Sequence, residues 1–134
     1  MGTWIEIRDG MKTRLATISG LVAHDTVPKT VPDKDVAIVL YGEPLVAPAG
    51  HGTLVAVGVR VVVRVSRGDL KDAQEAIDAY LWPTGAKSIV AAVAGDRTLG
   101  GKVQETQWRE TGAIGTTEDG SMQGEVSFRC TVTA

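Results

Sequence analysis

The residues with the strongest chemical suggestion run from Gly95 to Lys102, where a glycine pair precedes a lysine. A phosphate-binding loop places its lysine directly after the second glycine, follows it with a serine or threonine for the metal, and opens a helix towards the phosphate. Here an extra glycine intervenes before Lys102, and Val103 stands where the hydroxyl belongs. The segment also follows a helical pattern and enters a strand pattern. The spacing therefore argues against nucleotide binding.

Metal coordination and nucleophilic catalysis have no better support. His24, His51 and Cys130 lie far apart, and none has a second ligand at a spacing such as i, i+4. Ser121 lies between Gly120 and Met122, and the chain contains no Gly-x-Ser-x-Gly elbow. We expect no catalytic residue, no metal site and no bound cofactor, and hence a protein that is not an enzyme.

Arg60 and Arg64 are a different kind of candidate, because they share one face of the most regular strand pattern in the sequence. Valine occupies every odd position from Val55 to Val65, which predicts one buried face. On the opposite face, the arginines either lie in solvent with their stems covering apolar surface, or meet another subunit or line a channel. Against a neighbouring subunit they would pair with carboxylates. Both interpretations stay open.

Three helices are predicted around this strand. Each begins at a side chain that can accept a hydrogen bond from a free backbone N–H group, and each ends at a glycine or just before a proline. The first and second carry an apolar stripe at three- and four-residue spacing. The predicted helices run from the cap Thr3 to Ser19-Gly20, from the cap Asp69 to Trp82, and from the cap Ser88 to Gly95.

Four strands are predicted from apolar runs and alternation. They are Val36 to Tyr41, Leu54 to Val65, Val103 to Thr111, and a last strand from Val126 to Thr133. The third alternates weakly and is expected to be an edge or subunit-facing strand, whereas alternation in the last one buries Cys130. The predicted loops are Leu21 to Lys34, Pro44 to Gly52, and Gly112 to Gly124.

This order of elements predicts an α+β fold, a mainly antiparallel sheet of about four strands packed against two or three helices. The length of 134 residues fits a single domain spanning residues 1–134. A net charge of −2 gives none of the basic excess typical of nucleic-acid binders. The single cysteine is compatible with assembly in the cytosol, and we expect neither a signal peptide nor a membrane span.

The stretch from Ile89 to Val103, a short helix followed by Asp-Arg-Thr-Leu-Gly-Gly and a strand, resembles the tail terminator and tail-completion proteins of siphophages. The forms found in actinobacteriophages are particularly similar. The preceding acidic helix with Tyr80-Leu81-Trp82-Pro83 and the C-terminal strand fit the same arrangement. The resemblance covers roughly Leu54 to Val132, while the N-terminal helix is compatible but generic.

The resemblance implies a structural protein that assembles into a ring, commonly a hexamer. Such a ring caps the tail tube, stops its polymerisation and offers a surface to head-completion proteins. The implied partners are further copies of the chain, the major tail tube protein and neck proteins, with no specific nucleic acid and no membrane. The implied location is the tail–neck region of the virion, after assembly in the bacterial host cytoplasm.

A ring built from one repeated contact needs two different patches on each chain. The candidate interface residues are Arg60, Arg64, Arg97, Trp108 and Arg109. The candidate turn residues are Asp96, Leu99, Gly100 and Gly101, with Asp96 expected to pair locally with Arg97 and Leu99 expected to enter the core. Two alternatives remain open: another neck, minor tail or head-completion protein, and a non-viral α+β ligand-binding module in which Trp4, Trp82 and Trp108 line a pocket.

Overall fold

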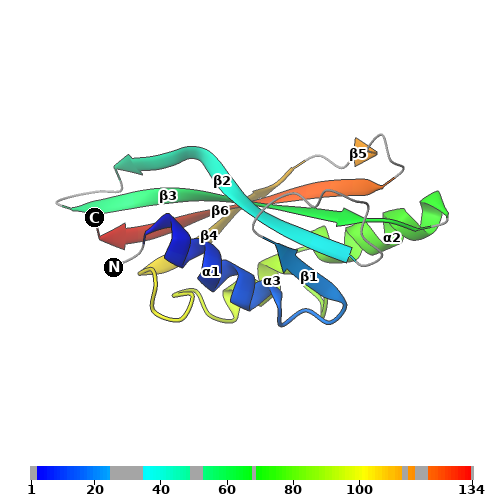
Figure 1. The fold of residues 1–134 in the computed structure, drawn as a ribbon, viewed down its shortest axis with the longest axis horizontal. Coiled ribbons are helices and arrows are strands. Elements are labelled where there is room, and N and C mark those ends of the chain that lie inside the picture. Colours follow the sequence, from blue (N-terminus) through cyan, green and yellow to red (C-terminus); the bar gives the residue numbers. More distant parts are fainter. Residues whose placement is uncertain are drawn as a thin grey trace.

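Three helices lie on one face of a single mixed sheet, giving an α+β fold of two layers (Figure 1). The computed structural model describes residues 3–24, 35–48, 53–67, 69–112, 115–116 and 121–133. Within them the elements are α1 (Trp4–Leu15), β1 (Leu21–His24), β2 (Asp35–Pro48), β3 (Leu54–Val65), α2 (Leu70–Leu81), α3 (Ile89–Ala94), β4 (Glu105–Thr111), β5 (Gly115–Thr116) and β6 (Met122–Thr133).

The predicted helix starts are confirmed by their caps. The side chains of Thr3, Asp69 and Ser88 each accept a hydrogen bond from a backbone N–H group in the first turn of their helix. These bonds satisfy donors that a helix leaves unpaired at its N-terminus. Trp82 ends α2 in an extended conformation, as a residue before proline must. Helix α1 ends at Leu15, earlier than the predicted Ser19-Gly20.

The predicted sheet of about four mainly antiparallel strands is corrected by the structure. Six strands are described, in the order β1-β2-β3-β6-β4 with β5 also paired to β6. Strand β1 is parallel to β2, so the sheet is mixed. The sequence predicts a loop from Leu21 to Lys34, because of Pro28, Pro32 and the weak periodicity, but its first four residues form β1. Residues 25–34 lie outside the described part of the chain. Pairing with Asp35 to Ile38 supplies the hydrogen bonds that hold this short strand.

Strand β2 also differs from its prediction, because it continues to Pro48 where a loop from Pro44 is expected. Its register against β3 shifts between Tyr41 and Val46, so that four residues of β2 lie opposite Gly58. Such a bulge tolerates a proline, which cannot donate to the ladder. Residues 49–52 lie outside the described part of the chain.

The predicted turn region from Gly112 to Gly124 is partly strand. It contains β5 and the first residues of β6, which pair with each other. Strand β4 pairs with the remainder of β6. Residues 113–114 and 117–120 lie outside the described residues. The prediction of β4 as an edge strand is confirmed, since β6 is its one paired neighbour among the described strands.

The core lies between the sheet and the helices. Five valines of β3, from Val57 to Val65, are buried against the helical layer, as their alternation predicts. The matching residues of β6 are Val126, Phe128, Cys130 and Val132. Burial raises the pKa of the Cys130 thiol to about 11, so this side chain acts as a small apolar residue at neutral pH.

One buried ion pair joins the ends of three elements. The Asp35 carboxylate at the start of β2 accepts two hydrogen bonds from Arg67, at 2.6 and 2.9 Å, and one from the Tyr80 hydroxyl of α2 at 2.5 Å. Burial alone would raise the pKa of Asp35, but the bonds from Arg67 and Tyr80 outweigh it and lower that pKa. The charged form of Asp35 therefore stabilises the fold.

Replacing Asp35 with asparagine should lower the free energy of unfolding by about 2 kcal/mol at neutral pH, because Arg67 and Tyr80 lose a charged acceptor. The pKa of Asp35 is lowered in the folded state, so its stabilisation is present above the ordinary aspartate pKa and is lost as pH falls through the lowered value. Urea unfolding of both proteins at pH 7 and at about pH 3 measures this effect.

A matched control is Asp9→Asn, because the Asp9 side chain is 58% exposed where it pairs with Arg8 at 3.7 Å; this change should alter stability by less than about 0.5 kcal/mol. Equal effects of the two substitutions at pH 7 would contradict a special role for the buried pair.

Candidate functional site

The turn from Asp96 to Val103 is held by one carboxylate. Asp96 accepts hydrogen bonds from the Thr98 backbone N–H at 3.2 Å, the Thr98 hydroxyl at 2.7 Å and the Gly100 N–H at 2.9 Å. The bonds from the Thr98 hydroxyl and from the Gly100 N–H stabilise the charged carboxylate and lower the pKa of Asp96. The Thr98 hydroxyl also accepts a hydrogen bond from the Gly101 backbone N–H. Local pairing of Asp96 with Arg97, expected from the sequence, is replaced by these bonds.

Three consecutive residues of the turn have left-handed backbones. The φ angles are 51° at Leu99, 72° at Gly100 and 86° at Gly101. Glycine adopts this conformation freely, whereas leucine pays about 1 kcal/mol for it. The Leu99 side chain is 2% exposed within the core, and its burial contributes roughly 2 kcal/mol. The predicted anchoring of the turn by Leu99 is therefore confirmed.

Gly10 of α1 lies directly against this turn. A Cβ atom at Gly10 would lie 2.9 Å from both the Cβ and the carbonyl oxygen of Leu99. The sequence suggests only that Gly10 weakens the helix, but the structure shows that its missing side chain lets α1 approach the turn. A second contact joins α1 to α3, the helix that precedes the turn. Arg14 of α1 donates a 2.9 Å hydrogen bond to the Ala92 carbonyl of α3.

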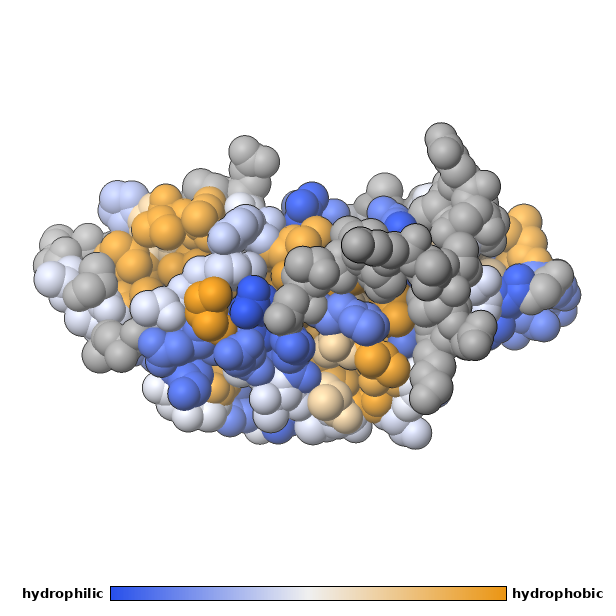
Figure 2. Space-filling view, in the orientation of Figure 1, coloured by the Kyte–Doolittle hydropathy of each residue, from blue (hydrophilic) through white to orange (hydrophobic). Residues whose placement is uncertain are grey.

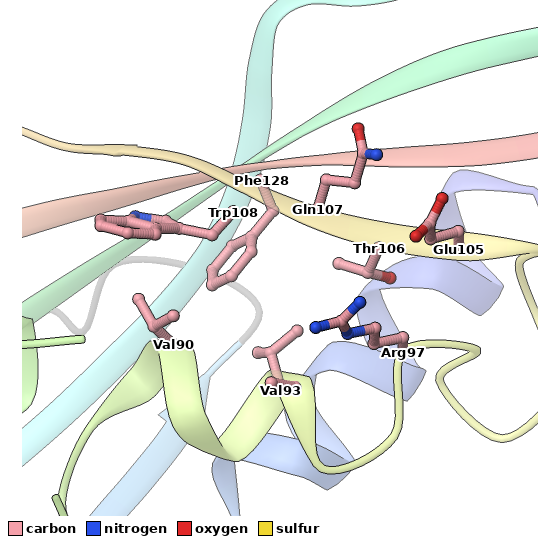
Figure 3. Close-up of a pocket in the computed structure, with 9 residues that line it drawn as sticks. Val90, Val93, Arg97, Glu105, Thr106, Gln107, Trp108 and Phe128 are labelled. Carbon is pink, nitrogen blue, oxygen red and sulfur yellow. The ribbon is translucent and has the colours of Figure 1, made fainter. Parts of the chain in front are cut away.

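The two candidate residues Arg97 and Trp108 lie together in a groove between α3 and the edge strand. This α3–β4 groove has a volume of about 380 Å³ and is lined by Val90, Val93, Ala94, Arg97, Glu105, Thr106, Gln107, Trp108 and Phe128. Arg97 extends towards Thr106, while Val90 and Val93 rise from α3 beneath the two rings (Figure 3). Trp108 is 44% exposed, which is high for a tryptophan in an apolar groove.

The other three candidates, Arg60, Arg64 and Arg109, lie on the sheet face that none of the described helices covers. Arg60 pairs with Glu125 at 3.7 Å, and Arg64 donates a 3.4 Å hydrogen bond to Gln123. Both acceptors are on β6, the neighbouring strand. This face is not simply solvated, because Val36, Ile38 and Val62 are also buried on it.

Arg109 shares a hollow with Arg129, a residue that the sequence does not single out. This arginine hollow has a volume of about 250 Å³ and is lined by Ala47, Pro48, Ala56, Gly58, Arg109 and Arg129. Arg129 pairs in register with Gly58, which also lines the hollow. Alternation of the last strand places Arg129 opposite the core, but only the strand register brings it to Arg109.

Strand β4 thus separates two chemically different surfaces. Adjacent side chains of a strand point to opposite faces, so Trp108 and Arg109 lie on different sides of the sheet. The register shift between Trp108 and Glu110 then leaves Glu110 on the same side as Arg109. Trp108 faces the apolar groove under the sheet, and Arg109 faces the hollow above it. Among the described residues, the guanidinium groups of Arg97, Arg109 and Arg129 have no hydrogen-bond or ion-pair partner.

A third surface is apolar and lies at the end of the β2–β3 hairpin (Figure 2). Tyr41, Leu45 and Val46 are exposed there, and Trp4 packs on Tyr41 with ring centroids 4.6 Å apart. Trp82, by contrast, is exposed after α2. The three tryptophans therefore occupy separate places, and Trp108 is the one that lines the α3–β4 groove.

Within the described residues, no group of three metal-ligating side chains comes together, and no helix is long and apolar enough to cross a membrane. No protein-family model matches the chain, and a search of curated proteins finds no match. What the surfaces can bind follows from their side chains. Unpaired guanidinium groups favour carboxylates, and an exposed indole in an apolar groove favours apolar side chains.

Gly10→Ala should destabilise the protein by about 1–2 kcal/mol, although alanine is the better helix former by about 1 kcal/mol. The added methyl group meets a backbone carbonyl that the turn holds in place. Thermal unfolding measures the change. Gly115→Ala is the control, because a Cβ there meets no atom within 4 Å. A Gly10→Ala protein as stable as the wild type would disprove the close contact.

Leu99→Asp should prevent folding, since it places an unpaired carboxylate in the core at a cost of several kcal/mol.

Lys102→Ala should leave folding and assembly intact, because Lys102 is exposed. Circular dichroism and size-exclusion chromatography measure both variants. A Lys102→Ala protein that fails to fold or elutes differently from the wild type would contradict this assignment of Lys102 to the exposed surface.

Proposed function

We propose that this protein is a structural component of a siphophage tail, a tail terminator that closes into a ring on the end of the tail tube. The ring stops tube polymerisation and presents a surface to head-completion proteins. It acts by binding and not by catalysis. The resemblance of Ile89 to Val103 to tail terminator and tail-completion proteins supports the proposal, and this stretch forms α3 and the turn that leads into β4.

The observation that carries the proposal is the pair of unlike surfaces on either side of β4. A ring made from one repeated contact uses two different patches on each subunit, whereas a two-fold dimer uses the same patch twice. The α3–β4 groove combines apolar side chains with Arg97 and Glu105, whereas the arginine hollow has two cations and no carboxylate among its described lining residues. Chemically different patches on one chain are suited to a head-to-tail contact.

Direct pairing between sheet edges fits this chain less well. The sequence of β4 is Glu-Thr-Gln-Trp-Arg-Glu-Thr, and four of its side chains, Glu105, Gln107, Arg109 and Glu110, are polar or charged and exposed. Charged side chains and a bulge are the usual means by which an edge strand resists pairing with another edge. Subunit contacts are therefore assigned to side chains beside β4.

The partners in this proposal follow from the same surfaces. The groove and the hollow of each copy are both covered by neighbouring copies, in a ring of six if the resemblance extends to the number of subunits. The exposed apolar end of the β2–β3 hairpin, with Tyr41, Leu45 and Val46, is available to the major tail tube protein or to a neck protein. Apolar patches rimmed by polar residues are common at such contacts. The assembled ring would lie in the tail–neck region of the virion.

Trp108→Ala should weaken the ring while leaving the subunit folded. Tryptophans in the middle of an interface often contribute 2 kcal/mol or more, so the protein concentration at half-assembly should rise at least about tenfold. Native mass spectrometry across a dilution series measures this concentration. The control is Trp82→Ala, because Trp82 is even more exposed and lies outside both surfaces.

The same preparations should be added to growing tail tubes. The wild type should halt elongation as a ring, and Trp108→Ala should do so only at higher concentration. A wild-type protein that stays monomeric at every concentration and never joins tail tubes would disprove the proposed function.

A further inference from the structure

The arginine hollow contains two cations without a counter-ion. Neither Arg109 nor Arg129 has an ion-pair partner among the described residues, and the Nε atom of Arg129 is buried without a hydrogen bond. The buried Nε atom of Arg129 has lost its water without gaining an acceptor, which is costly, whereas Arg109 is exposed and open to a partner. The walls of the hollow, Ala47, Pro48 and Ala56, are small and leave room for a side chain to enter. A partner that supplies one or two carboxylates would therefore fit the two arginines of the hollow.

Two of the three carboxylates of helix α2, Glu75 and Asp78, lie on one exposed stripe with Lys71. Lys71, Glu75 and Asp78 follow the spacing i, i+4, i+7, so they form one stripe along the exposed side of the helix. This acidic stripe borders an open depression of about 640 Å³ between α2 and Met122 of β6. Within the described part of the chain, none of the three side chains has a hydrogen-bond or ion-pair partner.

The two surfaces are complementary in detail. The hollow has two cations, with Glu110 in the adjoining depression, and the stripe has two anions with Lys71 at one end. Among the described residues Glu110 has no side-chain partner. Both signs are therefore matched when the stripe meets the hollow. Both surfaces belong to one chain but lie on different layers, since the hollow is on the sheet face that none of the described helices covers and α2 covers the other face. Contact between them requires a second copy.

We propose that the arginine hollow of one subunit receives the acidic stripe of α2 from the next subunit, with Arg109 and Arg129 bound to Glu75 and Asp78. The inference rests on the proposed ring and assigns its polar contact. Bidentate pairing of guanidinium with carboxylate fixes direction as well as affinity, and so sets the rotation between neighbours.

A nucleic-acid backbone is the competing anion, and the surroundings of the hollow disfavour it. Glu110 and Glu125 line the adjoining depression, and the whole chain has a net charge of −2. Phosphates along a duplex would meet these carboxylates as well as the arginines. Helix α2 also carries carboxylates, but its Lys71 offsets part of this repulsion, which a phosphate backbone cannot do.

Charge reversal tests the contact in the full-length protein. One variant is Arg109→Glu with Arg129→Glu, and the other is Glu75→Arg with Asp78→Arg. Each alone should raise the concentration at half-assembly at least about 100-fold in native mass spectrometry, because like charges replace two desolvated pairs. A 1:1 mixture of the two should recover the ring, with the variants alternating around it. Lys102→Glu is the control for a charge reversal elsewhere and should assemble normally.

The outcomes separate this inference from the proposed function. If the wild type forms rings and either reversed variant still does so at the same concentration, the assigned contact is wrong and the ring remains. If the mixture stays monomeric although each variant melts like the wild type, the contact is equally wrong. Loss of duplex DNA binding by the Arg109→Glu, Arg129→Glu protein with intact rings would assign the hollow to nucleic acid. A monomeric wild type would overturn both proposals together.

Discussion

The whole structure depends on one constraint, which is that all three helices pack on the same face of the sheet. The alternating valines of β3 and the matching residues of β6 can bury their side chains only under this layer. The ion pair of Asp35 with Arg67, closed by Tyr80, then fixes α2 to the ends of β2 and β3. As a consequence, no described helix covers the second face of the sheet, where arginine side chains and buried valines lie together.

The turn after α3 links the helical layer to the edge of the sheet. Asp96 holds the turn from within, Leu99 anchors it in the core, and the absence of a side chain at Gly10 lets α1 close over it. Because β4 begins directly after this turn, its position fixes both the depth of the α3–β4 groove and the bulge at Arg109. The segment that looks most like a phosphate loop in the sequence is thus a structural connection, and the surfaces that it positions are the ones suited to binding.

Local signals predicted the elements well, and long-range pairing accounts for what they missed. The caps Thr3, Asp69 and Ser88 and the valines of β3 act within one element, so the sequence shows them directly. Strand β1 has four residues and exists through its parallel pairing with β2, which no local period reveals. Proline at position 44 suggested a loop because the bulge that tolerates it depends on register with β3. For the same reason the candidate arginines divide between two surfaces, and Arg129 joins Arg109 only through its pairing with Gly58.

The central claim is that unlike surfaces on either side of β4 join copies of this chain head to tail. Electron cryomicroscopy of the assembled wild-type protein tests it most directly. The account predicts a closed ring with rotational symmetry, in which the groove and the hollow beside β4 are covered by a neighbouring subunit and the β4 edges remain unpaired. A two-fold dimer joined through paired β4 strands, or a ring that leaves both surfaces exposed, would contradict it.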